Sequence, residues 1–316
     1  MHAIQEDQQK YTQEILKHFI GDVRGDYPGP TVIAVAGIHG NEPTGIDAIQ
    51  DVIETLEPLK EHIHGRFVGL RGNITALESG VRFMEEDMNR LWTTSLLDKI
   101  RRTPFEEQKT ADRIQIKELL CILDPIMNGD EDVVFIDLHT FSGTGGMFAI
   151  TPKEERHMDL LSQLKIPLIF GIEHNLIGTS MTYVDEAGHL GFAFESGTHG
   201  TKEAEINALA GLMILLVASK VISPKKLPTF GEYYGYLLEK VEDFPHKADF
   251  VYKHVIEAGD EFVMNPGFQN FDSVEKGDWL ATDRQGKIEA QASGYLLMPL
   301  YQKQGNDGFF IVRDCD

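Results

Sequence analysis

Short apolar runs and helical patterns alternate along the first two thirds of the chain. The runs that predict strands are Thr31–Gly37, Arg66–Arg71, Val133–His139, Phe148–Thr151, Pro167–Ile172 and Gly191–Glu195. The stretches that predict helices are Pro43–Leu56, Glu106–Ile122 and Thr201–Ile222, the first with a proline in its first turn. Strands interleaved with helices predict an α/β fold, in which helices cover a mostly parallel sheet.

The pattern changes near Ser223, where a stretch with two prolines and two glycines begins. Beyond Val241 the chain has short strand-like runs that are separated by glycine, asparagine, aspartate and proline. We therefore predict a catalytic domain over residues 1–223, a linker over 224–241 and a small β domain over 242–316.

Charge narrows the range of partners. The 316 residues include 29 basic and 50 acidic ones, a formal net charge of −21. This balance repels nucleic acid and anionic membranes, so neither is expected as a partner. The longest apolar run, Ala208–Ala218, is too short to span a bilayer and is interpreted as a core helix. With two cysteines and no apolar leader segment, the chain is expected to be a cytoplasmic protein.

The strongest chemical signal is the heptapeptide GIHGNEP. It places His39 and Glu42 in a glycine turn after an apolar strand, where ligands gather beyond the strand ends of a sheet. His139 ends a second apolar strand, and two histidines with one glutamate are a common zinc set in hydrolases. The alternative is a turn histidine beside a glutamate at a helix N-terminus. The pair His254 and Glu257 has the same spacing without this context and is interpreted as a surface pair.

Four segments in order, GIHGNEP, VRFMEEDMNR, DLHT and FESG, resemble the succinylglutamate desuccinylase/aspartoacylase family, and the tail MPLYQKQGNDGFF looks similar to it as well. The resemblance implies a zinc-carboxypeptidase-like fold, a mixed sheet flanked by helices, and a zinc-dependent amidohydrolase or deacylase activity. It also implies that His39, Glu42 and His139 bind one Zn²⁺ ion.

A zinc hydrolase needs a general base beside its metal. Glu195 ends an apolar strand in GFAFESG, and partial burial there would raise its pKa toward the working pH. The resemblance implies that Glu195 is the catalytic glutamate. The alternatives are that Glu195 caps the helix expected from Thr201, or that Glu173, which also follows an apolar run, is the base.

Two arginines in an acidic segment are candidates for binding negative charge. Guanidinium groups suit both a carboxylate and a developing oxyanion. The resemblance implies that Arg82 lies near the reacting carbonyl and that Asn89 and Arg90 bind a substrate carboxylate. The alternative is that the arginines pair at the surface with their acidic neighbours, which are Glu85, Glu86 and Asp87.

Two further polar residues, Tyr301 and Asp137, each have two interpretations. Tyr301 lies in the tail, where the family has a tyrosine that could reach the pocket; the alternative is an aromatic residue in the core of the β domain. Asp137 shares a strand face with His139, so it either supports that histidine or is a buried acceptor. The remaining histidines of interest are interpreted as loop or core residues; they are His174, His189 and His199.

Aspartoacylase-like members carry a further arginine ahead of the catalytic glutamate, for a second substrate carboxylate. Here no lysine or arginine occurs between Lys165 and Lys202. A dicarboxylic product such as aspartate is therefore less favoured, and an N-acyl amino acid with one carboxylate or a peptide-like substrate fits the sequence equally well. The expected partner is a small anionic substrate, an N-acyl amino acid. The alternatives are a zinc carboxypeptidase that acts on a peptide and a metal-binding module without catalysis. The sequence is compatible with a homo-oligomer.

Overall fold

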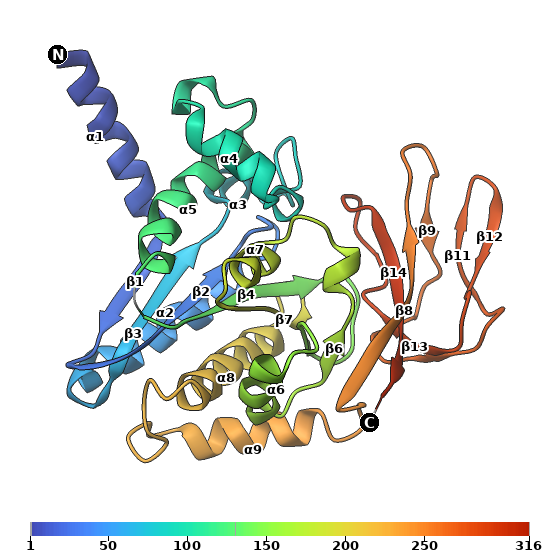
Figure 1. Ribbon diagram of the computed structural model, residues 1–316. Helices are drawn as coiled ribbons and strands as arrows, with labels where there is room; N and C mark the ends of the chain where they lie inside the picture. The colour runs from blue at the N-terminus through green and yellow to red at the C-terminus, as the bar shows by residue number, and fades with distance from the viewer. Residues whose placement is uncertain (1, 130, 316) are drawn as a thin grey trace.

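The computed structural model describes residues 2–129 and 131–315 of the chain (Figure 1). Within these residues the main sheet has eleven strands in the order β1-β3-β2-β4-β7-β5-β6-β8-β14-β13-β10. A second sheet has three strands in the order β12-β11-β9. The pairs β2–β3, β2–β4 and β4–β7 are parallel, whereas β5–β7 and the pairs of the last four strands are antiparallel. The main sheet is therefore mixed.

The element bounds follow in two groups. The strands are β1 (Phe19–Arg24), β2 (Tyr27–Ala36), β3 (His64–Arg71), β4 (Val133–Phe141), β5 (Phe148–Ile150), β6 (Leu168–Phe170), β7 (Leu190–Thr198), β8 (Lys247–Val255), β9 (Val263–Met264), β10 (Ser273–Val274), β11 (Trp279–Asp283), β12 (Gly286–Glu289), β13 (Gly294–Leu297) and β14 (Asp307–Asp314). The α-helices are α1 (His2–Lys17), α2 (Thr44–Leu56), α3 (Ile74–Ser79), α4 (Thr94–Arg102), α5 (Ala111–Met127), α6 (Glu155–Leu161), α7 (Ser180–Glu186), α8 (Lys202–Ala218) and α9 (Phe230–Lys240), and the short 3₁₀ helix η2 spans Met88–Arg90.

Helices cover both faces of the parallel part of the sheet, because its strands are apolar on both sides. Along β2, Val32 and Ala34 pack in a core with residues of α2 and α8, while Ile33 and Val35 pack in another with residues of α4 and α5. Successive side chains of a strand point to opposite faces, so one continuous apolar run supplies both cores. Figure 1 shows α2, α8 and α9 on one side of the sheet and α4 and α5 on the other.

The predicted fold class, an α/β mixed sheet flanked by helices with a small β sheet near the C-terminus, is confirmed. All six predicted strands and all three predicted helices are present, with ends that shift by a few residues. The helix expected over Glu106–Ile122 begins later, at Ala111, where the Thr110 side chain accepts from the backbone N–H of Arg113 and caps it.

The C-terminal region departs from a simple separate domain. Strand β8 pairs in parallel with β6, and β14, β13 and β10 extend the main sheet from there. Only β9, β11 and β12 form the separate small sheet, on the right in Figure 1. The segment 224–241, interpreted as a linker, contains helix α9, whose Leu237 is fully buried. In the described part of the chain, no helix combines the length and apolar character needed to cross a membrane.

Candidate metal and catalytic centre

A tight turn between β2 and α2 positions His39 and Glu42. Gly37 begins the turn with φ +75°, a conformation that favours glycine. A Cβ on Gly40 would lie 2.1 Å from the backbone carbon of Ala76, so only glycine allows this approach. The Glu42 N–H donates to the His39 carbonyl at 3.0 Å, which closes the turn and directs both side chains to the end of the sheet.

The neighbouring strands bring His139 and Glu195 to the same place. Strands β4 and β7 are parallel, and their register pairs His139 with Glu195 directly. Directly paired residues on neighbouring strands project from the same face of a sheet. The two side chains therefore face one cavity of about 100 Å³, together with His39, Glu42 and Arg82.

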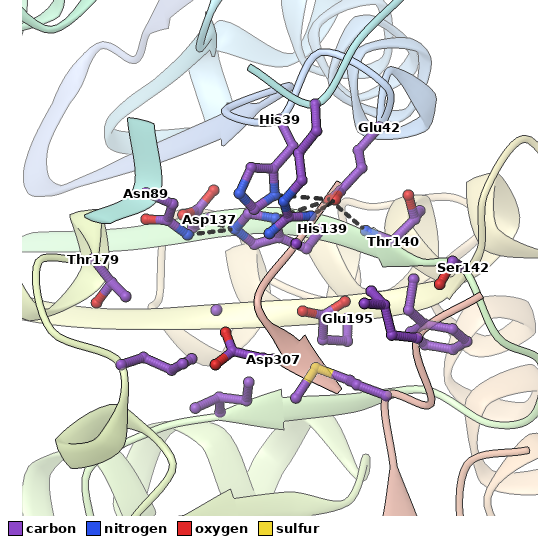
Figure 2. A pocket seen from close by; sticks show the side chains of 18 of the residues that line it. His39, Glu42, Asn89, Asp137, His139, Thr140, Ser142, Thr179, Glu195 and Asp307 are labelled. Atoms are coloured by element: carbon purple, nitrogen blue, oxygen red, sulfur yellow. Dashed lines mark hydrogen bonds and ion pairs between the residues drawn. The ribbon is translucent and has the colours of Figure 1, made fainter. Parts of the chain in front are cut away.

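Three side chains converge on one point within this cavity (Figure 2). His39 Nδ1 lies 3.0 Å from Glu42 Oε1, and His139 Nδ1 lies 2.9 Å from Glu42 Oε2. One donor atom from each residue falls within 4.8 Å of the others, and all three side chains are buried. Although His39 Nδ1 lies close to Glu42, the two groups are not oriented to form a hydrogen bond, so this buried nitrogen has no hydrogen-bond partner in the protein. Two imidazole nitrogens and a carboxylate around a common point are donors that suit zinc, so the residues fit one divalent cation.

The outer nitrogens of both imidazoles face aspartates. His39 Nε2 lies 3.2 Å from Asp87 Oδ1, and His139 Nε2 lies 2.9 Å from Asp137 Oδ2. Asp137 also accepts from the Ser180 hydroxyl at 2.5 Å, so it both supports His139 and is a buried acceptor. Carboxylates in this position orient a metal-binding histidine and raise its basicity.

These contacts shift the pKa values of the group. Burial opposes ionisation of Glu42, but His39 and His139 outweigh it and hold the Glu42 pKa well below its usual range. Burial also opposes protonation of His139, yet Asp137 and Glu42 hold the His139 pKa well above its usual range. Burial also opposes ionisation of Asp87, but the neighbouring charge of His39 outweighs it and lowers the Asp87 pKa. The carboxylates thus stabilise positive charge at this point.

Glu195 has a different environment. It is buried, and its Oε2 has no hydrogen-bond partner. Burial raises the Glu195 pKa to about 8, against the opposing effect of His139. A carboxyl group with this pKa can exchange a proton near neutral pH, as a general base requires.

Arg82, Asn89 and Arg90 line the same cavity. Arg82 Nη1 donates to Glu42 Oε1 at 3.1 Å, and its Nε is buried without a hydrogen-bond partner. The Asn89 amide nitrogen lies 3.2 Å from His139 Nε2. Arg90 Nη2 donates to Asp307 Oδ2 at 2.6 Å. The cavity therefore combines the candidate metal ligands with two guanidinium groups.

The structure does not bring Tyr301 into the cavity wall. Its ring is 40% exposed, and its hydroxyl donates to the Asn265 carbonyl at 2.7 Å. The neighbouring residues Leu300 and Gln302 line the cavity instead. The backbone around Tyr301 is irregular rather than a strand, and the hydrogen bonds of its hydroxyl to the carbonyls of Asn265 and Phe268 hold the tyrosine away from the cavity.

Glu173, the other candidate for the base, and the pair His254 and Glu257 lie outside this cavity. Glu173 is buried in a short 3₁₀ helix, where burial raises its pKa, but it does not line the cavity. His254 lies on β8 and is half-buried rather than at the surface, since its ring stacks on Phe309 and Phe262 at 5.3 and 5.4 Å.

A second group with the geometry of a metal site comprises Glu154, His157 and Asp185. Arg156 hydrogen-bonds to both Glu154 and Asp185 through its guanidinium group. Because one guanidinium group already pairs with both acids, this group is interpreted as an ion-pair network.

Three residues of the site were not predicted in these roles. Asp87 was expected only as a partner of the nearby arginines. Thr140 donates its backbone N–H to Glu42 Oε2 at 3.1 Å, and Asp307 reaches the cavity from β14. The strand-end position of Thr140, directly after His139, was the one available signal; Asp307 had none, because its contact spans 217 residues of sequence.

Comparisons with known proteins agree with this geometry. A family model described as "Succinylglutamate desuccinylase/Aspartoacylase catalytic domain" matches residues 28–217. A probable aspartoacylase of Nostoc sp. is 26% identical over 85% of this chain and 90% of that protein. A succinylglutamate desuccinylase of Pseudomonas fluorescens is 25% identical over 91% and 84%. A crystal structure of a succinylglutamate desuccinylase/aspartoacylase from Rhodobacter sphaeroides superposes with TM-score 0.68 at 18% identity, covering 93% of this chain and 88% of that one.

Proposed function

Because the chain belongs to the succinylglutamate desuccinylase/aspartoacylase family, we propose that it is a zinc-dependent hydrolase that removes the acyl group from an N-acyl amino acid. One observation carries the proposal: the Nδ1 atoms of His39 and His139 meet the two oxygens of Glu42 in a cavity that also holds the unpartnered carboxyl oxygen of Glu195.

In this proposal His39, Glu42 and His139 would hold the zinc ion. Zinc in such a site supplies a Lewis acid that polarises a carbonyl and activates water for attack. The outer aspartates, Asp87 and Asp137, keep both imidazoles in the orientation that presents Nδ1 to the ion.

Glu195 acts as general base and then as general acid. It takes a proton from the attacking water on a carboxyl oxygen and passes it to the leaving amine nitrogen. A bound cation would lower the Glu195 pKa from about 8, so that the carboxylate form is available at neutral pH. Partial desolvation keeps the pKa close enough to neutrality for the return of the proton.

The arginines bind the charges of the substrate. Arg82, which lies against Glu42, is placed to stabilise the oxyanion that forms on the attacked carbonyl. Asn89 and Arg90 bind the carboxylate of the amino-acid part through N–H donors. These donors suit an N-acyl amino acid, whose carboxylate they can bind.

The decisive variant is Glu195→Gln, which keeps the size of the side chain and removes its basicity. We expect zinc to remain bound at one ion per chain, and kcat to fall by at least about a hundredfold. Metal analysis and turnover of a panel of N-acyl amino acids and short peptides give both readings. Retained turnover in this variant contradicts the role of Glu195, and turnover of peptides alone favours a carboxypeptidase.

A further inference from the structure

Asp307 places a carboxylate inside the candidate substrate pocket. It is the first residue of β14, and Arg90 lines the same cavity. Figure 2 shows the Asp307 carboxylate in this cavity. Arg90 Nη2 donates to Asp307 Oδ2 at 2.6 Å, and Lys253 Nζ lies 3.1 Å from Asp307 Oδ1. With a side chain only 17% exposed, Asp307 is held between two cations at the pocket wall.

The pair changes what Arg90 can bind. Arg90 Nη1 donates to the Asn89 carbonyl at 2.8 Å and Nη2 to Asp307, so any carboxylate on Arg90 would also lie close to the Asp307 carboxylate. Arg90 and Lys253 carry two positive charges and Asp307 one negative charge, which leaves one net positive charge. That balance accommodates one anionic group and opposes a second.

Among the ion pairs that the described residues form with the Asp307 carboxylate, Arg90 and Lys253 supply the only cations. The lining of the cavity that contains Asp307 also includes apolar side chains, namely Ile150, Leu176, Met181, Met298 and Phe310. The segments that contribute Leu176 and Met181 lie between Lys165 and Lys202, where the chain has no lysine or arginine. An acidic side chain here would be desolvated next to a carboxylate, which is costly without a partner.

We propose that Asp307 determines substrate specificity: it restricts the enzyme to N-acyl amino acids with one carboxylate and excludes acidic side chains such as that of aspartate. This inference rests on the proposed function, in which Arg90 binds the carboxylate of the amino-acid part. Uncharged side chains fit the apolar wall, and a side-chain amine gains a hydrogen bond from the Asp307 oxygens.

The test uses three substrates of similar size: N-acetylaspartate, N-acetylasparagine and N-acetyl-2,4-diaminobutyrate. If the substrate panel identifies another acyl group, that group replaces acetyl. For the zinc-loaded protein we expect kcat/KM on the neutral and amine-bearing substrates to exceed that on the aspartate substrate at least about tenfold. In Asp307→Asn and Asp307→Ser this preference should shrink at least about tenfold, mainly through a lower KM for the aspartate substrate.

The matched control is Asp249→Asn, which removes an aspartate from an exposed ion pair with Lys153 outside the cavity and should leave the preference unchanged. Calorimetric binding of free aspartate, asparagine and 2,4-diaminobutyrate to the zinc-loaded Glu195→Gln protein measures the same preference without turnover. If the preference against the aspartate compound is the same with and without the Asp307 charge, in kinetics or in binding, the proposed role of Asp307 is overturned. Binding that follows the expected order without turnover by the wild-type protein contradicts only the proposed function.

Discussion

Each imidazole at the site has one nitrogen directed at Glu42 and the other at an aspartate. Replacing either aspartate by asparagine removes the charge that orients the ring and raises its basicity. We expect Asp87→Asn and Asp137→Asn each to weaken zinc binding by about 10- to 100-fold. Competition against a chelator of known affinity measures this change.

Asp22→Asn serves as the control for zinc binding, because Asp22 on β1 pairs with Arg66 on β3, away from the cavity. Zinc affinity that is equal in the wild-type protein and in both site variants would show that the aspartates do not support the metal ligands.

The ion pair between Arg113 and Glu86 should make the stability of the fold depend on pH. Arg113 donates two hydrogen bonds of 2.6 Å to Glu86, and these lower the Glu86 pKa below the ordinary value of 4.5. A depressed carboxyl pKa stabilises the fold above the unfolded-state pKa, and the contribution disappears as the pH falls through the folded-state value. We expect Glu86→Gln to cost about 1 kcal/mol at pH 7 and progressively less as the pH falls below the ordinary glutamate value of 4.5. Urea denaturation of both proteins across this range checks it; a constant difference contradicts it.

At the scale of single residues, the sequence predicts those site residues whose position follows from the local pattern of apolar strands. His39, Glu42, His139 and Glu195 each lie at the end of an apolar strand, and strand ends of neighbouring strands meet at one edge of a sheet. Asp307 could not be predicted, because its contact with Arg90 depends on how β14 joins the sheet. Tyr301 was a candidate for the pocket but lies outside its wall, because the direction of a side chain in an irregular tail does not follow from its position in the sequence.

At the scale of elements, buried runs were easy to recognise and helix α9 was not. Its two glycines, Gly231 and Gly235, are typical of a loop, but both lie on the exposed face of the helix with open space around the Cα. The aromatic residues between and after them pack on the core instead. Tertiary packing therefore overrides the low helix propensity of glycine here.

The exposed glycine of α9 offers a stability test. Alanine at Gly235 meets no atom within 4 Å and restricts the unfolded chain, so Gly235→Ala should raise the free energy of unfolding by about 0.5–1 kcal/mol. Gly188→Ala is the control: it also has open space, but its φ of +91° strains any side chain, so it should lower that free energy. Urea denaturation of both variants measures the signs. A loss of stability with Gly235→Ala would argue that residues 230–240 are not helical.

At the scale of the whole molecule, the candidate ligands tie separate parts of the chain together. His39 and Glu42 follow β2 and His139 lies in the last part of β4, so unfolding must separate them. Zinc that binds only the folded chain should stabilise it by about 4 kcal/mol at a thousandfold excess over its Kd. Thermal denaturation of metal-free protein with and without added zinc should therefore show a higher Tm with zinc.

The variant His39→Asn should lose this rise in Tm, because the metal then keeps only two of its ligands. A similar rise in the variant would place the zinc ion elsewhere on the chain, for instance at the group of Glu154, His157 and Asp185.

One wall of the cavity comes from Met298 to Asp307, beyond the stretch 28–217 that matches the family. Asp307, which is proposed to choose the substrate, is thus encoded outside the stretch that supplies the proposed metal ligands and base. Exchange of the tail between family members could redirect an enzyme to a new amino acid while its reaction chemistry is inherited intact. A fragment that ends at residue 223 would keep the proposed metal ligands, the base and Arg90, yet it would lack Asp307 and the cavity wall that Met298 to Asp307 contribute.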